Sequence, residues 1–179
     1  MTSETRLVVT GHDESDKAVF ASDERVIPTT LSILPGLEFR ELWGSDEPQS
    51  YPDSGAPPSA PAYFPPVGGF RFIVVSMPPE GDDGLPDDLE SAFVESESKL
   101  PGLIGTMEQD EPGMHTTDTT DFDIVMSGTL VLELDDGAEV TLTQGDVVIQ
   151  NGTRHRWRNP GDVPAVLGTA MIGAHRLSP

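Results

Sequence analysis

From Gly113 onward, short apolar runs alternate with turn residues at close spacing. The runs are IVMSG, TLVLELDDG, AEVTLTQGD, VVIQNG, RHRWRNPGD and AVLGTAMIG. Many short strands at this spacing are typical of an antiparallel sandwich or barrel. Asp136-Gly137, between two of the runs, predicts a hairpin turn because glycine tolerates positive φ. The pattern therefore predicts an all-β fold for this region.

Before Gly113, the sequence predicts a few separate elements rather than a regular series of strands. Short β-type runs, including FRELW from Phe39, indicate a β-rich arm, and residues 48–69 hold so much Pro, Gly and Ser that we expect a long loop there. FRFIVVSM, from Phe70, predicts a strand, and DDLESAFVESESKL, from Asp87, predicts one short helix. We expect residues 1–69 to form the arm and loop, and residues 70–179 to form the barrel.

Composition excludes several classes of function. Ten basic residues against 31 acidic ones give a formal charge of -21, which repels nucleic acid and anionic membranes. There are no cysteines, so disulfides, thiolate metal sites and a Cys nucleophile are excluded. The N-terminal residues lack the apolar core of a signal peptide and no apolar run reaches membrane-spanning length, so we expect a cytoplasmic location.

Metal-type ligands gather in HTTDTTDFD, from His115 to Asp123. In a strand, residues two apart face the same way, so Asp121, Asp123 and Val125 should share one face. Two interpretations are open. The aspartates are turn formers beside an exposed His115, or they enter a cavity where His115, Asp121 and His155 converge. We favour the convergent site.

Two stretches resemble the motifs of the cupin family. His115, Thr117, Asp121 and Gly128 fall at the positions of the two histidines, the glutamate and the final glycine of the first cupin motif. GTRHRWRN, which contains His155, matches the spacing of the end of the second motif. Thr117 stands where the family has its second histidine, and Asp121 where it has glutamate.

The resemblance implies a double-stranded β-helix, or jelly-roll barrel, with the first motif at about residues 113–128 and the second at about 145–159. It also implies a homodimer in which the N-terminal strands pack on the partner's sheet. Two imidazoles and a carboxylate suit a divalent Fe, Mn, Ni or Zn ion, so His115, Asp121 and His155 are the predicted metal ligands.

Further roles follow from the expected cavity. Asp121 and His155 are candidate acid–base groups, and Thr117, Val125 and Trp157 are candidate substrate contacts. For Asp123, either burial raises its pKa and it moves protons, or an arginine such as Arg71, Arg154 or Arg158 pairs with it. We expect pairing. Alternation places Arg154, Arg156 and Arg158 opposite His155, which indicates surface ion pairs.

The leading functional hypothesis is a small-molecule metalloenzyme. A divalent ion would polarise a carbonyl or enol oxygen while Asp121, Asp123 or His155 moves a proton, giving isomerase, lyase, dehydratase or decarboxylase chemistry. The alternatives are an iron-dependent dioxygenase, a non-catalytic cupin that binds a small ligand, and a metal-free acid–base catalyst.

Overall fold

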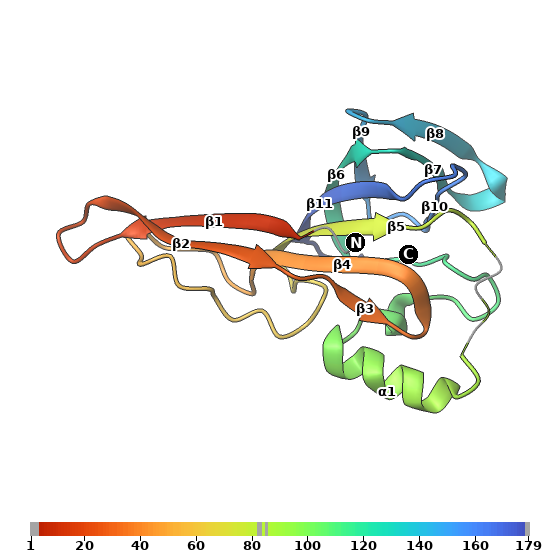
Figure 1. Ribbon diagram of the computed structural model, residues 1–179, viewed down its shortest axis with the longest axis horizontal. Coiled ribbons are helices and arrows are strands. Elements are labelled where there is room, and N and C mark those ends of the chain that lie inside the picture. The colour runs from red at the N-terminus through yellow and green to blue at the C-terminus, as the bar shows by residue number, and fades with distance from the viewer. Residues whose placement is uncertain (1–3, 82–83, 85, 178–179) are drawn as a thin grey trace.

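The computed structural model describes residues 4–81, 84 and 86–177. Its strands form three antiparallel sheets (Figure 1). The largest has the order β3 (Thr29–Leu31), β4 (Leu34–Ser45), β5 (Phe70–Met77), β11 (Ala165–Gly173), β6 (Thr119–Ser127) and β9 (Val147–Asn151). The second has the order β10 (Arg156–Arg158), β7 (Thr129–Glu133) and β8 (Glu139–Thr143). The third is the hairpin of β1 (Thr5–His12) and β2 (Ala18–Val26).

One of two hydrophobic clusters lies between the two larger sheets. Buried Val125 and Leu167 of the six-stranded sheet pack with Leu130, Leu132 and Leu142 of the three-stranded sheet. Burial of these aliphatic side chains on both inner faces holds the sheets together. The mostly β architecture expected from the sequence is confirmed, and the Asp136-Gly137 turn has positive φ at both residues, 57° and 70°.

Strand β6 alternates strictly between inward and outward residues. Asp121, Asp123 and Val125 are buried, whereas Phe122 and Ile124 are exposed. The outer face of the six-stranded sheet is also apolar on the neighbouring strands, because Phe122 lies opposite Ile149 of β9. Exposed apolar residues on this face are Phe72, Phe122, Ile124, Met126, Val147, Ile149 and Ile172.

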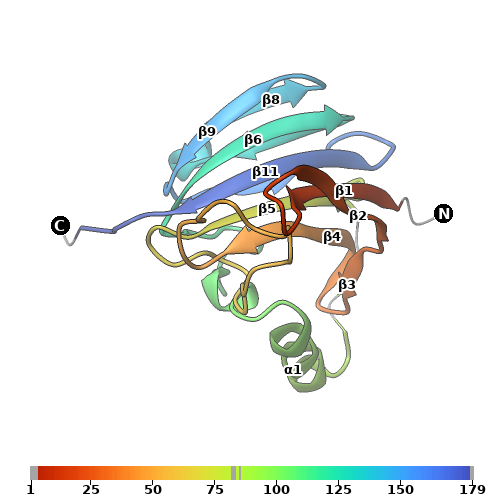
Figure 2. The ribbon, with the colours of Figure 1, turned by 90° about the vertical axis from the view of Figure 1, so that its left-hand side faces the viewer.

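The six-stranded sheet crosses the boundary expected at residue 69. Strands β3 and β4 precede that boundary, yet β4 pairs with β5 along its length, with Trp43 opposite Phe72. Phe39 and Leu42 of β4 are buried, so this segment is part of the barrel rather than of the arm. Figure 2 shows the strands of this sheet side by side, with the helix beyond β3.

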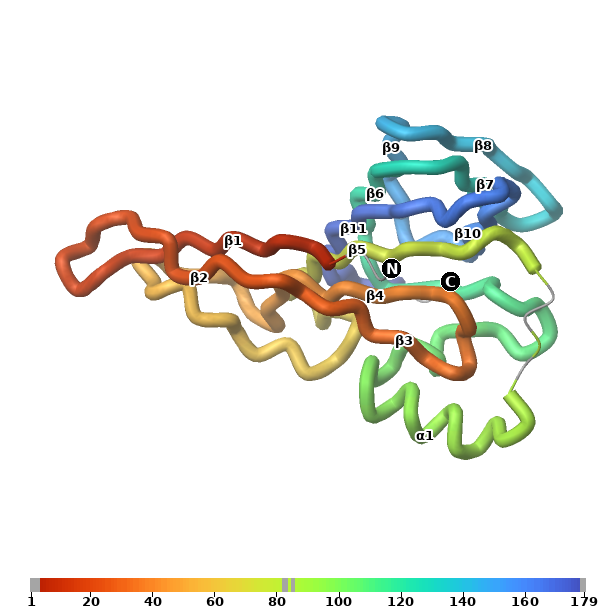
Figure 3. Tube along the Cα trace, in the orientation of Figure 1, coloured from red at the N-terminus to blue at the C-terminus, as the bar shows by residue number. Residues whose placement is uncertain are grey.

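The hairpin of β1 and β2 projects away from the barrel (Figure 1). The proline-rich loop runs out beside it and returns to β5 (Figure 3). The backbone N–H of His12 donates to the Asp53 carbonyl at 2.7 Å, which joins the hairpin to the loop. As expected, residues 48–69 contain no helix or strand.

The predicted helix is confirmed as α1 (Leu89–Lys99). Asp88 caps its N-terminus, because a carboxylate oxygen accepts a hydrogen bond from the Ser91 N–H at 3.0 Å. After α1 the chain makes short turns, η1 (Ile104–Thr106) among them; a second, η2 (Asp135–Gly137), joins β7 to β8. Within the described ranges, no helix is long and apolar enough to cross a membrane.

Candidate functional site

One end of the barrel contains a cavity of about 240 Å³. Most of its wall is apolar, supplied by β4, β5, β11, the proline-rich loop and the turns after α1. The polar side chains on the wall are Tyr63, His115, Thr117, Asp121, Asp123, His155 and Thr169. The cavity therefore combines an apolar body with a compact polar end, the usual composition of a small-molecule site.

Strand β6 brings two carboxyl groups into this cavity. Asp121 and Asp123 are 6% and 3% exposed, and the alternation of β6 turns both inward. Thr169 lies opposite Asp123 in the β6–β11 register, and its hydroxyl donates to Asp123 Oδ1 at 2.7 Å. The Oδ1 atom of Asp121 is buried and has no hydrogen-bond partner among the described residues. An unpaired buried carboxyl oxygen is costly, and a ligand that donated a hydrogen bond to it would remove that cost. The Oδ1 atom of Asp121 is therefore a candidate ligand contact.

Burial changes the protonation of both acids. It raises the pKa of Asp121 to about 6, against a smaller opposing effect of a hydrogen bond from Thr119. Burial also raises the pKa of Asp123 to about 7; the Thr169 hydrogen bond lowers it and the Asp121 charge adds to the rise. Two carboxyl groups with pKa values near neutral pH can give and take protons under ordinary conditions.

The two histidines lie side by side next to these acids. His115 and His155 exchange backbone hydrogen bonds of 2.9 and 3.0 Å, and their ring centroids are 4.2 Å apart. Each ring places Nδ1 at 2.9 Å from a backbone carbonyl, that of Gly113 or Thr153. Since a carbonyl only accepts, Nδ1 carries the proton and Nε2 keeps its lone pair.

Both imidazoles are neutral at neutral pH. Burial, followed by the neighbouring His115, lowers the pKa of His155 to about 4. Burial likewise lowers the pKa of His115 below its ordinary value. The polar end of the cavity therefore offers two uncharged acceptors at Nε2 beside two carboxyl groups.

The predicted metal ligands lie on the same cavity wall, but they do not form a binding set. Among the residues that the structure describes, no group of three or more His, Asp or Glu side chains could hold a metal ion. Catalytic zinc sites use three protein ligands, and the described His115, Asp121 and His155 side chains are not close enough together to form such a group. The donors present thus do not fit the metal centre expected from the sequence.

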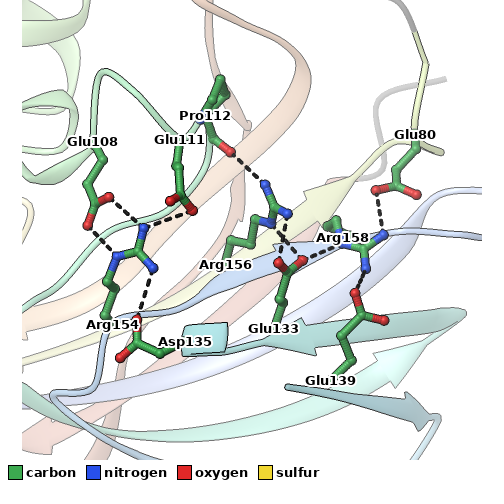
Figure 4. A network of polar contacts seen from close by, with 10 residues as sticks. All are labelled: Glu80, Glu108, Glu111, Pro112, Glu133, Asp135, Glu139, Arg154, Arg156 and Arg158. Carbon is green, nitrogen blue, oxygen red and sulfur yellow. Dashed lines mark hydrogen bonds and ion pairs between the residues drawn. The ribbon is translucent and has the colours of Figure 1, made fainter. Parts of the chain in front are cut away.

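The arginines near His155 face away from the cavity. Arg154 binds Glu108, Glu111 and Asp135, while Arg156 and Arg158 share Glu133 (Figure 4). The surface ion pairs expected from alternation are therefore confirmed. The expected pairing of Asp123 with an arginine is wrong, because Asp123 is bonded to Thr169.

The remaining candidates divide between cavity and core. Thr117 and Trp157, two of the predicted substrate contacts, lie on the cavity wall. Val125 is 1% exposed and packs in the core between the sheets, so it is not part of the wall. Sequence reasoning missed Thr169 and Tyr63. The former is identified by its register opposite Asp123, whereas the latter lies in a loop without periodic signal.

Comparisons with known proteins agree with this architecture. A family model described as "Cupin domain" matches residues 104–172. "Oryzines biosynthesis cluster protein J" of Aspergillus oryzae is 48% identical over 50 residues, 28% of this chain and 28% of that protein. "Phomopsin biosynthesis cluster protein C'" of Diaporthe leptostromiformis is 46% identical over 65 residues, 34% of each chain. The matches thus span about a third or less of these relatives.

Among solved structures, similarity is found to a Cupin 2 conserved barrel domain protein from Salinispora arenicola. It has 18% identity and a TM-score of 0.43, and the match covers 81% of this chain and 82% of that one. A putative ethanolamine utilization protein from Salmonella typhimurium has 9% identity and a TM-score of 0.45, covering 97% and 99%.

Proposed function

Residues 104–172 of this chain are a cupin domain, and from that premise we propose that the protein is a small-molecule isomerase that moves protons without a metal ion. The observation that carries the proposal is the pair Asp121 and Asp123, both turned into an otherwise apolar cavity beside two neutral imidazoles. The names of two relatives, which belong to biosynthesis clusters, support a small-molecule substrate.

The two acids suit complementary roles. At neutral pH Asp121 is mainly ionised, because its pKa is about 6, and its unpartnered Oδ1 can remove a proton from a carbon beside a carbonyl. Asp123, with a pKa of about 7, is protonated in about half of the molecules at neutral pH, and in that form it can share its proton with the carbonyl oxygen as charge develops there. Return of the proton from Asp121 to a different carbon completes an isomerisation, with no oxidant or leaving group.

His155 has a supporting role in this scheme. Its Nε2 is unprotonated and lies on the same wall, so it can accept a hydrogen bond from an enol hydroxyl. Because the donor set does not fit an ion, the scheme contains no metal-dependent step of the Lewis-acid or dioxygenase kind.

The test is hydrogen exchange in a simple ketone. Benzylacetone in D₂O should lose the NMR signals of the hydrogens beside its carbonyl when the protein is added, with a metal chelator present throughout. Asp121→Asn should slow this exchange by about a hundredfold or more, the usual contribution of a catalytic base. Asp162→Asn, which changes an exposed carboxylate, is the matched control and should exchange at the wild-type rate.

Two results would refute the proposal. Exchange that requires added Fe, Mn, Ni or Zn would restore the metalloenzyme hypothesis. Binding of benzylacetone with no exchange above the buffer rate would instead indicate a ligand-binding cupin.

A further inference from the structure

The proline-rich loop supplies two neighbouring residues to the cavity, Phe64 and the polar Tyr63. Tyr63 is 4% exposed and its ring forms part of the wall, although the loop otherwise runs along the hairpin. The sequence offers no strand or helix that would place it there. A long segment without secondary structure is often functional, so the position of Tyr63 requires an explanation.

Several contacts hold Tyr63 in one place. Its backbone N–H donates to the Pro101 carbonyl at 2.9 Å. The carbonyl of the preceding residue, Ala62, accepts from the buried guanidinium of Arg71 at 2.9 Å. The ring packs edge-to-face on Phe39 and Phe64, with centroid distances of 6.0 and 5.0 Å. The phenol is therefore positioned before any ligand arrives, which lowers the entropy cost of using it.

The hydroxyl of this phenol is available as a donor. Among the described residues, no hydrogen bond joins it to another side chain or carbonyl, and it is not one of the fully buried polar atoms that lack a partner, so it keeps some access to open space. Burial raises its pKa above the ordinary value, and the charges of Glu41 and Asp121 add to the rise. Tyr63 and Asp121 line the same cavity.

The charge of the cavity wall restricts the ligand. No lysine or arginine is among the wall residues that the structure describes, and two carboxyl groups are. A carboxylate or phosphate would enter an apolar space facing Asp121 and Asp123 without a cation to neutralise it, which is strongly unfavourable. The apolar residues that make up most of the wall favour a ligand with a hydrocarbon body.

We propose that Tyr63 donates a hydrogen bond to the oxygen of an uncharged, mainly apolar carbonyl substrate, and that the cavity rejects anions. This inference rests on the proposed function, because it places the substrate in the same cavity. It narrows the chemistry, since substrates that are themselves carboxylates, as in decarboxylation of an acid, are excluded. It also gives the proline-rich loop a role as the segment that carries a substrate-binding residue.

The test is a binding comparison by calorimetry with four compounds that share a phenylalkyl body. Wild-type protein at neutral pH should bind benzylacetone more tightly than propylbenzene, which lacks the oxygen. It should bind hydrocinnamate, an anion, at least about tenfold more weakly than benzylacetone. Phenethylamine tests the opposite charge: its ammonium group has no oxygen to accept the Tyr63 hydrogen bond and loses its water on entering a mostly apolar space, so it should also bind more weakly than the ketone.

Tyr63→Phe removes only the hydroxyl. It should weaken benzylacetone binding roughly two- to tenfold, as expected for one net hydrogen bond, and leave propylbenzene binding unchanged. Tyr51→Phe is the matched control: Tyr51 lies in the same loop, is 73% exposed, and is the other of the two tyrosines. Its binding should equal that of the wild type.

Several outcomes would overturn the inference. Equal loss of benzylacetone and propylbenzene binding in Tyr63→Phe would show that the ring position, not the hydroxyl, was changed. Unaltered benzylacetone binding in that variant would show that the Tyr63 hydroxyl does not donate a hydrogen bond to the ketone. Tighter binding of hydrocinnamate or phenethylamine than of the ketone would show an ion-binding pocket. Because these are binding measurements, they can succeed while the hydrogen-exchange assay fails, which separates this inference from the proposed function.

Discussion

Replacement of Asp123 by asparagine should make the protein more stable at neutral and alkaline pH. The side chain is 3% exposed and Thr169 already donates to its Oδ1, so the amide oxygen of the Asp123→Asn variant can accept the same hydrogen bond. Asparagine resembles a protonated aspartic acid in shape but cannot ionise. The comparison therefore isolates the free energy of placing one charge in the cavity wall.

The size of the effect follows from the pKa difference. In the unfolded chain Asp123 has an ordinary pKa of 3.8, and in the folded protein burial raises its pKa to about 7. Between these values the native state binds more protons than the unfolded state, so the free energy of unfolding falls as pH rises. Each unit of difference between the two pKa values corresponds to about 1.4 kcal/mol. The free energy of unfolding therefore falls by about 4 kcal/mol up to pH 7 and changes little above it. The free energy of unfolding of the Asp123→Asn variant does not fall in this way, because asparagine cannot ionise.

Denaturant unfolding of wild type and Asp123→Asn at about pH 4 and about pH 8 measures the effect. The difference in free energy of unfolding should grow by about 4 kcal/mol in favour of the variant between the two conditions. The depressed pKa of His155, which makes stability rise with pH up to about 6.5, is common to both proteins and cancels. Asp162→Asn should show no such trend. A difference that stays constant within about 1 kcal/mol would refute the argument that Asp123 is protonated by burial.

Three further perturbations test other parts of the structure. Leu130→Ala removes a side chain that is 0% exposed in the core and should cost about 2–5 kcal/mol in denaturant unfolding; a loss below about 1 kcal/mol would contradict the packing. Glu133→Gln weakens the charge-assisted hydrogen bonds from Arg156 and Arg158 and should lower the thermal unfolding temperature, whereas an unchanged temperature would show that the network adds no stability. We propose that a second copy covers the apolar outer face of the six-stranded sheet, so sedimentation should show a homodimer that Phe122→Asp converts to monomer; a monomeric wild type would rule this out.

Local patterns in the sequence were sufficient for much of the fold. The β-type run from Phe70 and the helix after Asp87 were correct because each is determined by short-range signals, namely apolar continuity and a capping carboxylate. Alternation alone placed Asp121 and Asp123 on one face of their strand. The same rule correctly turned Arg154 and Arg158 away from His155.

The partners of the site residues depended on long-range pairing. Thr169 meets Asp123 only through the register of β6 with β11, 46 positions apart in the chain, so the sequence indicated an arginine as the partner instead. Tyr63 reaches the cavity because Arg71 holds the loop, a contact that composition does not reveal. Val125 follows the alternation, but it lies two residues beyond Asp123 on β6, where the strand faces the hydrophobic cluster between the sheets and not the cavity.

The central claim is that two buried carboxyl groups exchange protons near neutral pH without a metal. The most direct measurement is an NMR titration of the Asp121 and Asp123 carboxyl carbons in chelator-treated protein, with Asp121→Asn and Asp123→Asn for assignment. We expect apparent pKa values of about 6 and about 7, unchanged when Fe, Mn, Ni or Zn is added. Midpoints below about 4.5 for both groups, or midpoints that move sharply on addition of a metal, would contradict the account.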